Sequence, residues 1–108
     1  IERHYQTTGD LTSPLITLHT TGDPFVPYWH ELLYRMKVRR GGSTSLHSNI
    51  PAFRYGHCNF RISEVLVAFA LLVFKVTQQE LSGVENVLPD ADSRAEFMQL
   101  AQQYEALR

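Results

Sequence analysis

The segment from Pro14 to Thr20 (PLITLHT) constrains the fold more than any other part of the chain. It is rich in apolar and β-branched residues and lies between a proline and Gly22, a pattern that predicts a β-strand. The nearly continuous apolar run at residues 15–18 indicates burial on both faces, which is typical of strands in parallel sheets. A helical pattern over about residues 28–39 and a second short strand over residues 43–50 follow. The sequence therefore predicts an α/β fold built on a βαβ unit with two parallel strands.

Another helix is predicted after the second strand. Ser63 is a good N-cap, and with Glu64 in the first turn it predicts a helix that runs to about Val76. Its apolar surface extends nearly all the way round, so we expect this helix to pack against something large. Its apolar run at residues 65–74 has ten residues, whereas a membrane-spanning helix needs roughly 20. We therefore expect no membrane span.

The remaining segments are predicted to connect or extend these elements. Residues 51–61 are expected to form a loop, and residues 77–88 form a polar connector. A last helix is predicted from the segment Pro89–Ser93 through Leu107. Its apolar stripe comprises Phe97, Leu100, Ala101, Tyr104 and Leu107. This helix is more polar than the one before it, so it can dock either on the body of the domain or on a partner.

Two parallel strands cannot form a complete sheet. They leave open edges, and their apolar faces need covering on both sides. A chain of 108 residues can bury a core, but this one contains too few strands to close a sheet. We therefore predict that the chain holds only part of a sheet and that the missing strands come from elsewhere.

The composition excludes several classes of function. The net charge is −1, so bulk electrostatics give no reason to expect nucleic-acid binding. The local basic cluster at residues 35–40 is interpreted as the charged last turn of a helix, with a binding patch as the alternative. The single cysteine, Cys58, excludes an internal disulfide framework and a C-x-x-C motif. It does not indicate a cellular compartment.

Asp23 and His57 are the residues best placed for chemistry. Asp23 follows the first strand, where open α/β sheets place their sites, although an aspartate in Gly-Asp-Pro also suits a turn. His57 lies in a loop before a helix, where a surface or hydrogen-bonded histidine is the alternative. Because both residues follow consecutive strands of one sheet, we expect them at the same end of it. There Asp23 can hold the Nδ1–H of His57 and leave Nε2 as a general base.

A serine nucleophile, the third member of such a catalytic set, is not predicted in this chain. A nucleophile elbow has the pattern Gly-x-Ser-x-Gly. The nearest segment, residues 41–45 (GGSTS), ends in serine rather than glycine.

Other residues offer alternatives near the same positions. Cys58 is interpreted as a small packed thiol rather than a nucleophile, because adjacent residues in an extended loop tend to point apart. Three aromatic residues follow the acidic turn, namely Phe25, Tyr28 and Trp29. They are interpreted as core residues of the helix, and lining an acyl pocket is the alternative.

Metal binding is a further alternative. His30 begins a zinc-binding H-E-x-x-H pattern, but position 34 is tyrosine, so the motif fails. A metal site made of His19, Asp23 and His57 is possible from the residue types, although nothing in the spacing demands it.

The segments around Asp23 and His57 resemble those of α/β-hydrolase esterases. Residues 14–27 (PLITLHTTGDPFVP) resemble the penultimate strand and acid turn of that family, in which Gly-Asp is followed closely by Val-Pro and a helix. Residues 55–64 (YGHCNFRISE) resemble the catalytic-histidine loop, in which Gly-His precedes the final helix. The resemblance covers about residues 10–77, and acid before histidine matches the family order of Ser, Asp, His. It implies that Asp23 is the triad acid and His57 the triad base.

On this resemblance, the chain is the C-terminal part of a serine hydrolase that acts on carboxylic esters. Its strands would be the last two of a three-layer α/β/α sheet, with residues 1–77 in the hydrolase domain and residues 78–108 as a linker and helical extension. The family's nucleophile elbow lies upstream, and the chain begins at Ile1 without an initiator methionine. We therefore expect a processed or excised piece that is inactive alone.

The expected partners are the N-terminal remainder of the hydrolase and a small ester substrate, and neither a metal nor an organic cofactor is implied. The alternative is a non-catalytic assembly module. Such a module would complete a partner's sheet or form a homo-oligomer through its exposed strand edges.

Overall fold

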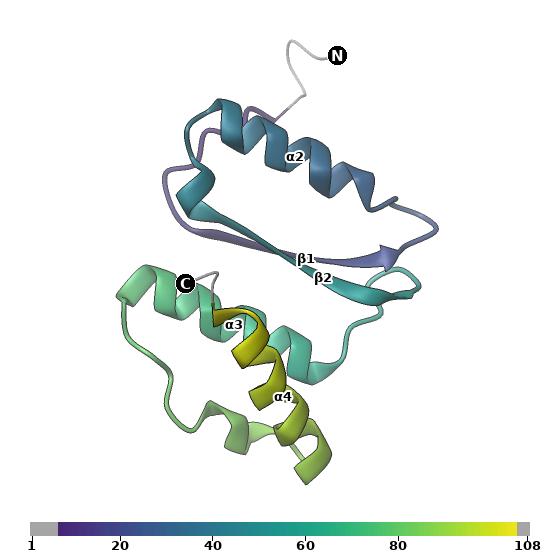
Figure 1. Cartoon of the computed structure of the whole chain (residues 1–108), viewed down its shortest axis with the longest axis vertical. Helices are drawn as coiled ribbons and strands as arrows, with labels where there is room; N and C mark the ends of the chain where they lie inside the picture. Colours follow the sequence, from purple (N-terminus) through teal and green to yellow (C-terminus); the bar gives the residue numbers. More distant parts are fainter. Residues whose placement is uncertain (1–6, 106–108) are drawn as a thin grey trace.

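The computed structural model describes residues 7–105, whose arrangement is shown in Figure 1. The elements follow in the order β1 (Leu15–Gly22), α2 (Trp29–Arg40), η1 (Thr44–Leu46), β2 (His47–Tyr55), α3 (Ile62–Thr77), η2 (Val84–Val87) and α4 (Ala91–Gln103). The two η elements are short 3-10 helices. Helix α2 lies on one side of the paired strands, and α3 and α4 lie on the other side (Figure 1).

Strands β1 and β2 pair in parallel, as the βαβ pattern predicts. The register places Leu15 opposite His47 and Thr20 opposite Ala52, with an irregularity just before Gly22 meets Tyr55. The carboxyl ends of both strands therefore lie at the same edge of the sheet. The prediction of a mixed α/β fold with two parallel strands is confirmed.

The second strand lies further along the chain than the sequence predicts. The prediction of a strand at residues 43–50 and a loop at residues 51–61 is wrong, because β2 continues to Tyr55 and follows η1. The predicted boundary rests on Pro51, since proline lacks the N–H of a sheet ladder. Within the described residues, β2 has a neighbour on one side only, and such edge strands tolerate proline.

The start of α3 also differs from the prediction. The N-cap residue is Arg61 rather than Ser63. The Glu64 carboxylate accepts the N–H of Arg61 at 2.7 Å, so it satisfies one of the free donors at the start of the helix. Ser63 lies inside the first turn, where it is buried and donates its hydroxyl to Glu96 of α4 at 2.6 Å. The predicted capping serine therefore joins two helices instead.

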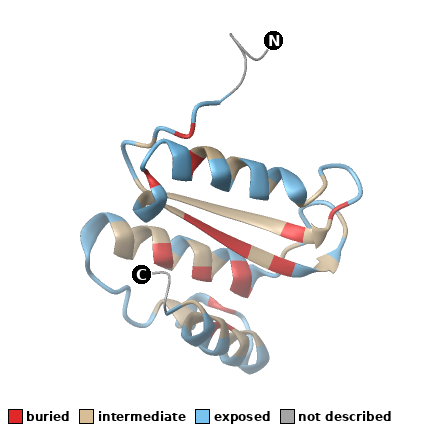
Figure 2. Cartoon of the chain, turned by 45° about the horizontal axis from the view of Figure 1, so that its top comes forward, coloured by how far each residue is buried: buried red, intermediate tan, exposed pale blue. Residues whose placement is uncertain are grey.

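Helices α3 and α4 share a core with the segment that connects them. Val67, Leu88 and Phe97 are buried there, with exposed fractions of 5% or less. Three residues of the predicted stripe of α4 pack against this cluster, namely Leu100, Ala101 and Tyr104. Figure 2 shows buried residues on α3 and on β2. Helix α4 therefore docks on the body of this chain.

Helix α4 begins close to its predicted start and ends earlier than predicted. Asp90 is the N-cap, and its carboxylate accepts the N–H of Ser93 at 2.7 Å. The helix ends at Gln103, with Tyr104 as the C-cap. The predicted end, Leu107, lies outside the described residues.

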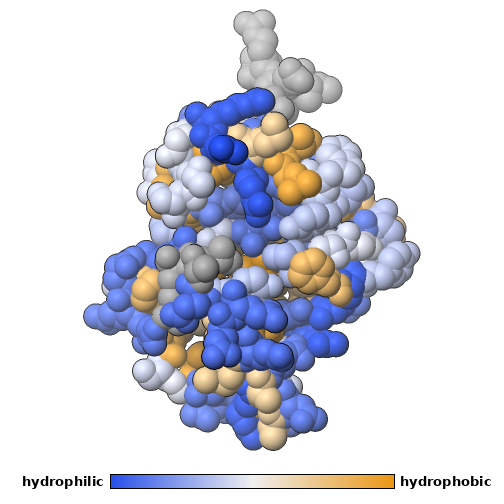
Figure 3. Space-filling model, in the orientation of Figure 1, coloured by the Kyte–Doolittle hydropathy of each residue, from blue (hydrophilic) through white to orange (hydrophobic). Residues whose placement is uncertain are grey.

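Apolar side chains remain exposed along α2. Trp29, Leu32, Leu33 and Met36 recur at helical spacing and form an apolar stripe, and each is about half exposed, at 47–53%. The buried residue of this helix is Val38. Figure 2 shows α2 as mostly exposed, and Figure 3 shows apolar surface over the same part of the molecule. The interpretation of Trp29 as a core residue is therefore wrong for this chain.

Apolar residues are also exposed on α3 and on β2. Those on α3 are Ile62, Val65, Phe69 and Val76, and those on β2 are Phe53 and Tyr55. Residues 7–105 thus leave one side of an almost fully apolar helix uncovered. None of the helices in this range is long and apolar enough to cross a membrane.

Candidate active site

Asp23 and His57 meet at the edge of the sheet where both strands finish. Asp23 directly follows β1, and His57 comes two residues after β2. Asp23 Oδ2 lies 2.6 Å from His57 Nδ1. The prediction that these residues lie within hydrogen-bond distance is confirmed. Because an ionised carboxylate only accepts hydrogen bonds, Nδ1 carries the proton.

The two oxygens of Asp23 have different partners. Oδ1 accepts the N–H groups of Phe25 and Val26, at 2.8 Å and 2.9 Å, and so closes the turn after β1. Oδ2 faces His57. Asp23 is therefore a turn residue and the hydrogen-bond partner of His57 at the same time, because each arrangement uses one oxygen.

The Asp23 carboxylate is buried and negatively charged, whereas the His57 ring that it contacts is accessible. Its side chain is 3% exposed, whereas that of His57 is 45% exposed. Burial raises the pKa of the Asp23 carboxyl, but the N–H of Val26, the ring of His57 and the N–H of Phe25 outweigh burial and lower the pKa to about 2. A buried anion that holds Nδ1 fixes the tautomer of His57, and Nε2 is then able to accept a proton.

The loop that carries His57 depends on Gly56. This residue has a φ of +117°, and a Cβ added to it would lie 3.1 Å from Cβ of Asn59. Its N–H donates to the carbonyl of Gly22 at 3.2 Å, and its own carbonyl accepts the hydroxyl of Thr20. Gly56 thus ties the histidine loop to the end of β1, which brings His57 next to the acidic turn.

An ion pair between Arg54 and Glu64 supports the same loop. The guanidinium binds the carboxylate through two hydrogen bonds, of 2.5 Å and 3.0 Å, and also donates to the carbonyl of Asn59 at 2.8 Å. Burial raises the pKa of the Glu64 carboxyl, but Arg54 and the N–H of Arg61 lower it below its ordinary value. Sequence analysis misses this pair, because no local pattern relates Arg54 to a residue ten positions away.

Cys58 lies beside the free nitrogen of His57. The thiol is exposed, and Sγ lies 3.6 Å from His57 Nε2. The predictions that Cys58 is packed and that it points away from His57 are therefore wrong. The backbone of Cys58 has a φ of +52°, so the chain here is not the extended loop that the prediction assumes. Among residues 7–105, no serine forms a hydrogen bond with His57.

The aromatic residues after the acidic turn have three different surroundings. The rings of Phe25 and His57 form a T-shaped contact with 5.9 Å between centroids, and Phe25 is 79% exposed. Tyr28 donates its hydroxyl to Asn49. Trp29 stacks on His30 at 4.0 Å on the outer side of α2. The interpretation as core residues is wrong for Phe25 and Trp29, and Phe25 instead borders the candidate site.

Polar side chains fill the contact between α2 and the sheet. The Thr17 hydroxyl donates to Glu31 at 3.0 Å and lies 2.9 Å from His47 Nε2. Since this hydroxyl has one proton, which Glu31 accepts, His47 Nε2 must be the donor in the second contact. Burial lowers the pKa of His47. This network is not predictable from the local sequence, because Thr17 lies in a nearly continuous apolar run and its partners are 14 and 30 positions away.

His19 approaches the same carboxylate as His57. Its Nε2 lies 3.5 Å from Asp23 Oδ2. The three residues of the metal-site alternative are thus neighbours. In the described part of the chain, no group of three or more His, Cys, Asp or Glu side chains has an arrangement that could hold a metal ion.

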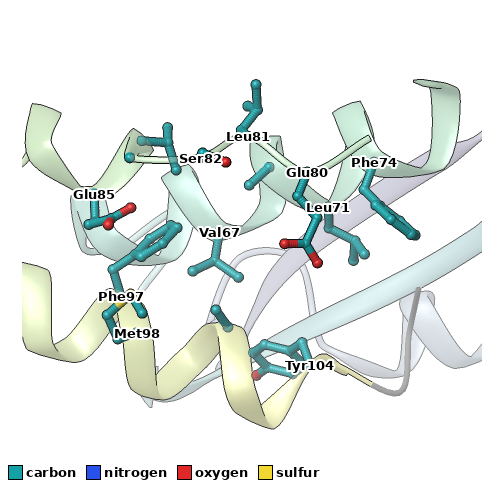
Figure 4. A pocket seen from close by; sticks show the side chains of 14 residues that line it. Val67, Leu71, Phe74, Glu80, Leu81, Ser82, Glu85, Phe97, Met98 and Tyr104 are labelled. Carbon is teal, nitrogen blue, oxygen red and sulfur yellow. The ribbon is translucent and has the colours of Figure 1, made fainter. Parts of the chain in front are cut away.

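A pocket of about 250 Å³ lies away from these residues, between α3, α4 and the segment that joins them. Its floor is apolar and includes Val67, Leu71 and Phe97, while Glu80 and Glu85 are also among its lining residues (Figure 4). Neither Asp23 nor His57 lines it. The pocket therefore belongs to the packing of the two helices and not to the candidate active site.

Comparison of the chain with protein-family models, with curated proteins and with solved structures finds no match.

Proposed function

We propose that Asp23 and His57 are the acid and base of a Ser-His-Asp triad in a carboxylic-ester hydrolase, and that this chain is the C-terminal part of its α/β-hydrolase domain. The observation that carries the proposal is the 2.6 Å contact between Asp23 Oδ2 and His57 Nδ1, with the carboxylate buried and the ring accessible. Their order in the chain and their place after two parallel strands support it.

Each residue would have one task in the reaction. A serine from a segment outside residues 1–108 would attack the ester carbonyl, and His57 Nε2 would take the proton of its hydroxyl. Asp23 would hold Nδ1–H and stabilise the imidazolium that forms. His57 would then return the proton to the leaving alcohol, and the same steps with water would release the acid. The donors that stabilise the oxyanion would come with the serine segment.

The exposed apolar surfaces support the proposal that this chain is only one part of a larger domain. The stripe on α2, defined by Trp29, Leu32, Leu33 and Met36, and the free edges of the sheet would both be covered by the remaining strands and helices. Residues 1–77 would belong to that domain, and residues 78–108 would extend it.

The test is ester hydrolysis by the natural protein that contains these residues. Rates with p-nitrophenyl esters of increasing acyl length would be measured for the unchanged protein and for Asp23→Asn, His57→Ala and the control Asp92→Asn. Loss of the acid should lower kcat by about 10⁴-fold, because the imidazole then adopts the wrong tautomer. The control should match the unchanged protein, since the Asp92 side chain is exposed on α4 and lies away from the α2 stripe. Equal rates for all four proteins would contradict the proposal.

The assembly-module alternative draws on the same exposed surfaces. A module of this kind would form a stable oligomer of defined size in light scattering, and it would hydrolyse no ester. Asp23→Asn would leave its oligomeric state unchanged, because Asp23 lies at the end of the sheet and not on the α2 stripe.

A further inference from the structure

His19 lies between the candidate active site and the polar contact of α2 with the sheet. It belongs to β1, four residues before Asp23, and its side chain is 13% exposed. Its Nε2 lies 2.7 Å from the carbonyl oxygen of Val26. Because a carbonyl only accepts hydrogen bonds, Nε2 must carry a proton. The ring is therefore either the neutral Nε2–H tautomer or the imidazolium.

The turn that follows Asp23 is fixed by two hydrogen bonds to the backbone of Val26. The N–H of Val26 donates to Asp23 Oδ1, and its carbonyl accepts from His19. The same nitrogen of His19 lies 3.5 Å from Asp23 Oδ2, the oxygen that faces His57. His19 thus fixes the backbone that orients the carboxylate, and its Nε2 lies near the carboxylate oxygen that must stay on His57.

The opposite side of the His19 ring is held by α2. Nδ1 lies 3.5 Å from Glu31, and the Tyr28 ring meets the imidazole edge-on with 5.6 Å between centroids. Glu31 is itself fixed, because it accepts the hydroxyl of Thr17. Rotation of the ring would therefore disrupt contacts at both nitrogens. A side chain that only filled space would have no polar contact at either ring nitrogen.

We propose that His19 is a positioning residue for Asp23, an inference that rests on the proposed function of the Asp23–His57 pair. Through Val26 and Oδ2 it keeps the carboxylate directed at His57 Nδ1. The Tyr28 ring at the N-cap of α2 packs against His19, and Glu31 of α2 can bind the ring when Nδ1 is also protonated. The start of α2 thus supports the residue that positions the acid. In the serine-containing protein, loss of this support should lower kcat by up to about 10²-fold, the effect of a displacement of about 1 Å. KM should change little, because His19 binds no substrate.

The first test is NMR of the full chain with ¹⁵N-labelled histidine. The proposal requires that His19 Nε2 carry a proton, which long-range ¹H–¹⁵N correlation identifies without any substitution. A neutral ring protonated only at Nδ1 would overturn the proposal, because such a ring cannot donate to Val26.

The second test follows the hydrogen-bonded Nδ1 proton of His57, which resonates far downfield when a carboxylate holds it. Asp23→Asn should remove this signal and so assign it. His19→Leu should broaden or remove it, while His19→Gln should retain it, since the glutamine amide places a donor close to the position of Nε2. His47→Leu is the matched control, because it removes a histidine from the same polar contact that does not touch the acidic turn.

The outcomes separate this proposal from the proposed function. An unchanged signal in His19→Leu would overturn the positioning role whatever the protein catalyses. Loss of the signal in His47→Leu as well as in His19→Leu would also overturn it, because the effect would then be general loosening of the contact with α2. Absence of ester hydrolysis in the natural protein would refute the triad without altering either NMR result.

Discussion

Asp23 Oδ2 lies 2.6 Å from His57 Nδ1, although the two residues are 34 positions apart in the chain. The contact arises from the topology, because parallel strands joined by a crossover helix finish at the same edge of their sheet. Gly56 then links the histidine loop to β1, and the turn after β1 fixes the carboxylate. Backbone hydrogen bonds therefore bring the two residues close together, and the side chains of Asp23 and His57 have only a short distance to span.

Replacement of Gly56 by alanine should destabilise the protein. Its φ of +117° is strained for any residue with a Cβ, and that Cβ would meet Asn59 at 3.1 Å. We expect a loss of about 1–3 kcal/mol in the free energy of unfolding, measured by urea denaturation. Gly42→Ala is the control, because its φ is +74° and its added Cβ would meet nothing within 4 Å. Equal losses in both variants would contradict the close packing of the histidine loop.

Acid should destabilise the folded chain through Asp23. The pKa of its carboxyl is about 2 in the folded chain and has an ordinary value of 3.8, so the unfolded chain binds more protons between these values. The stabilisation from Asp23 is therefore complete above about pH 4 and is lost as the pH falls toward 2. Thermal unfolding followed by circular dichroism should show a shallower pH dependence for Asp23→Asn in this window. A profile as steep as that of the unchanged chain would exclude this contribution.

Alkylation of Cys58 should block the free nitrogen of His57. The thiol is exposed and its Sγ lies 3.6 Å from Nε2, so a maleimide group on sulfur would occupy the space where a serine hydroxyl must approach. Treatment of the natural protein with N-ethylmaleimide should abolish ester hydrolysis, and mass spectrometry should locate the adduct on Cys58. Cys58→Ser should stay active after the same treatment. Inactivation of that variant to the same extent would show that another group is responsible.

The core between α3 and α4 should depend on Phe97. This side chain is 5% exposed and packs with Val67 and Leu88. Phe97→Ala should lower the free energy of unfolding by about 3–5 kcal/mol, the cost of a large cavity. Met98→Ala, next in the chain but 56% exposed, should change it by about 0.5 kcal/mol or less. A small effect of both substitutions would mean that α4 docks only weakly on the rest of the chain.

The sequence predicts the elements that have a strong local pattern. The strand at residues 15–18, the stripe of α4 and the turn at Asp23 all depend on near neighbours, and each is present in the structure. The expected burial of residues 15–18 on both faces is wrong for the described residues, because all four side chains are only half-buried. The proximity of Asp23 and His57 is also predictable, because it follows from topology and needs no knowledge of side-chain packing.

Contacts between distant residues are not predictable in this way. The Arg54–Glu64 pair and the contact of His19 with Glu31 join different elements, and no spacing in the sequence reveals them. The position of Cys58 is not predictable from the local pattern, because its backbone takes a left-handed conformation that is uncommon for cysteine. The interpretation of Trp29 as a core residue fails because the α2 stripe is about half exposed in residues 7–105.

The most direct measurement is labelling of the natural protein with a fluorophosphonate, followed by mass-spectrometric location of the modified residue. A serine activated by His57 should react, and it should lie outside residues 1–108. His57→Gln should abolish the labelling, and Asp23→Asn should slow it strongly, because both residues are needed to remove the serine proton. Labelling that is equally fast in the His57→Gln protein, or no labelled serine at all, would contradict the triad.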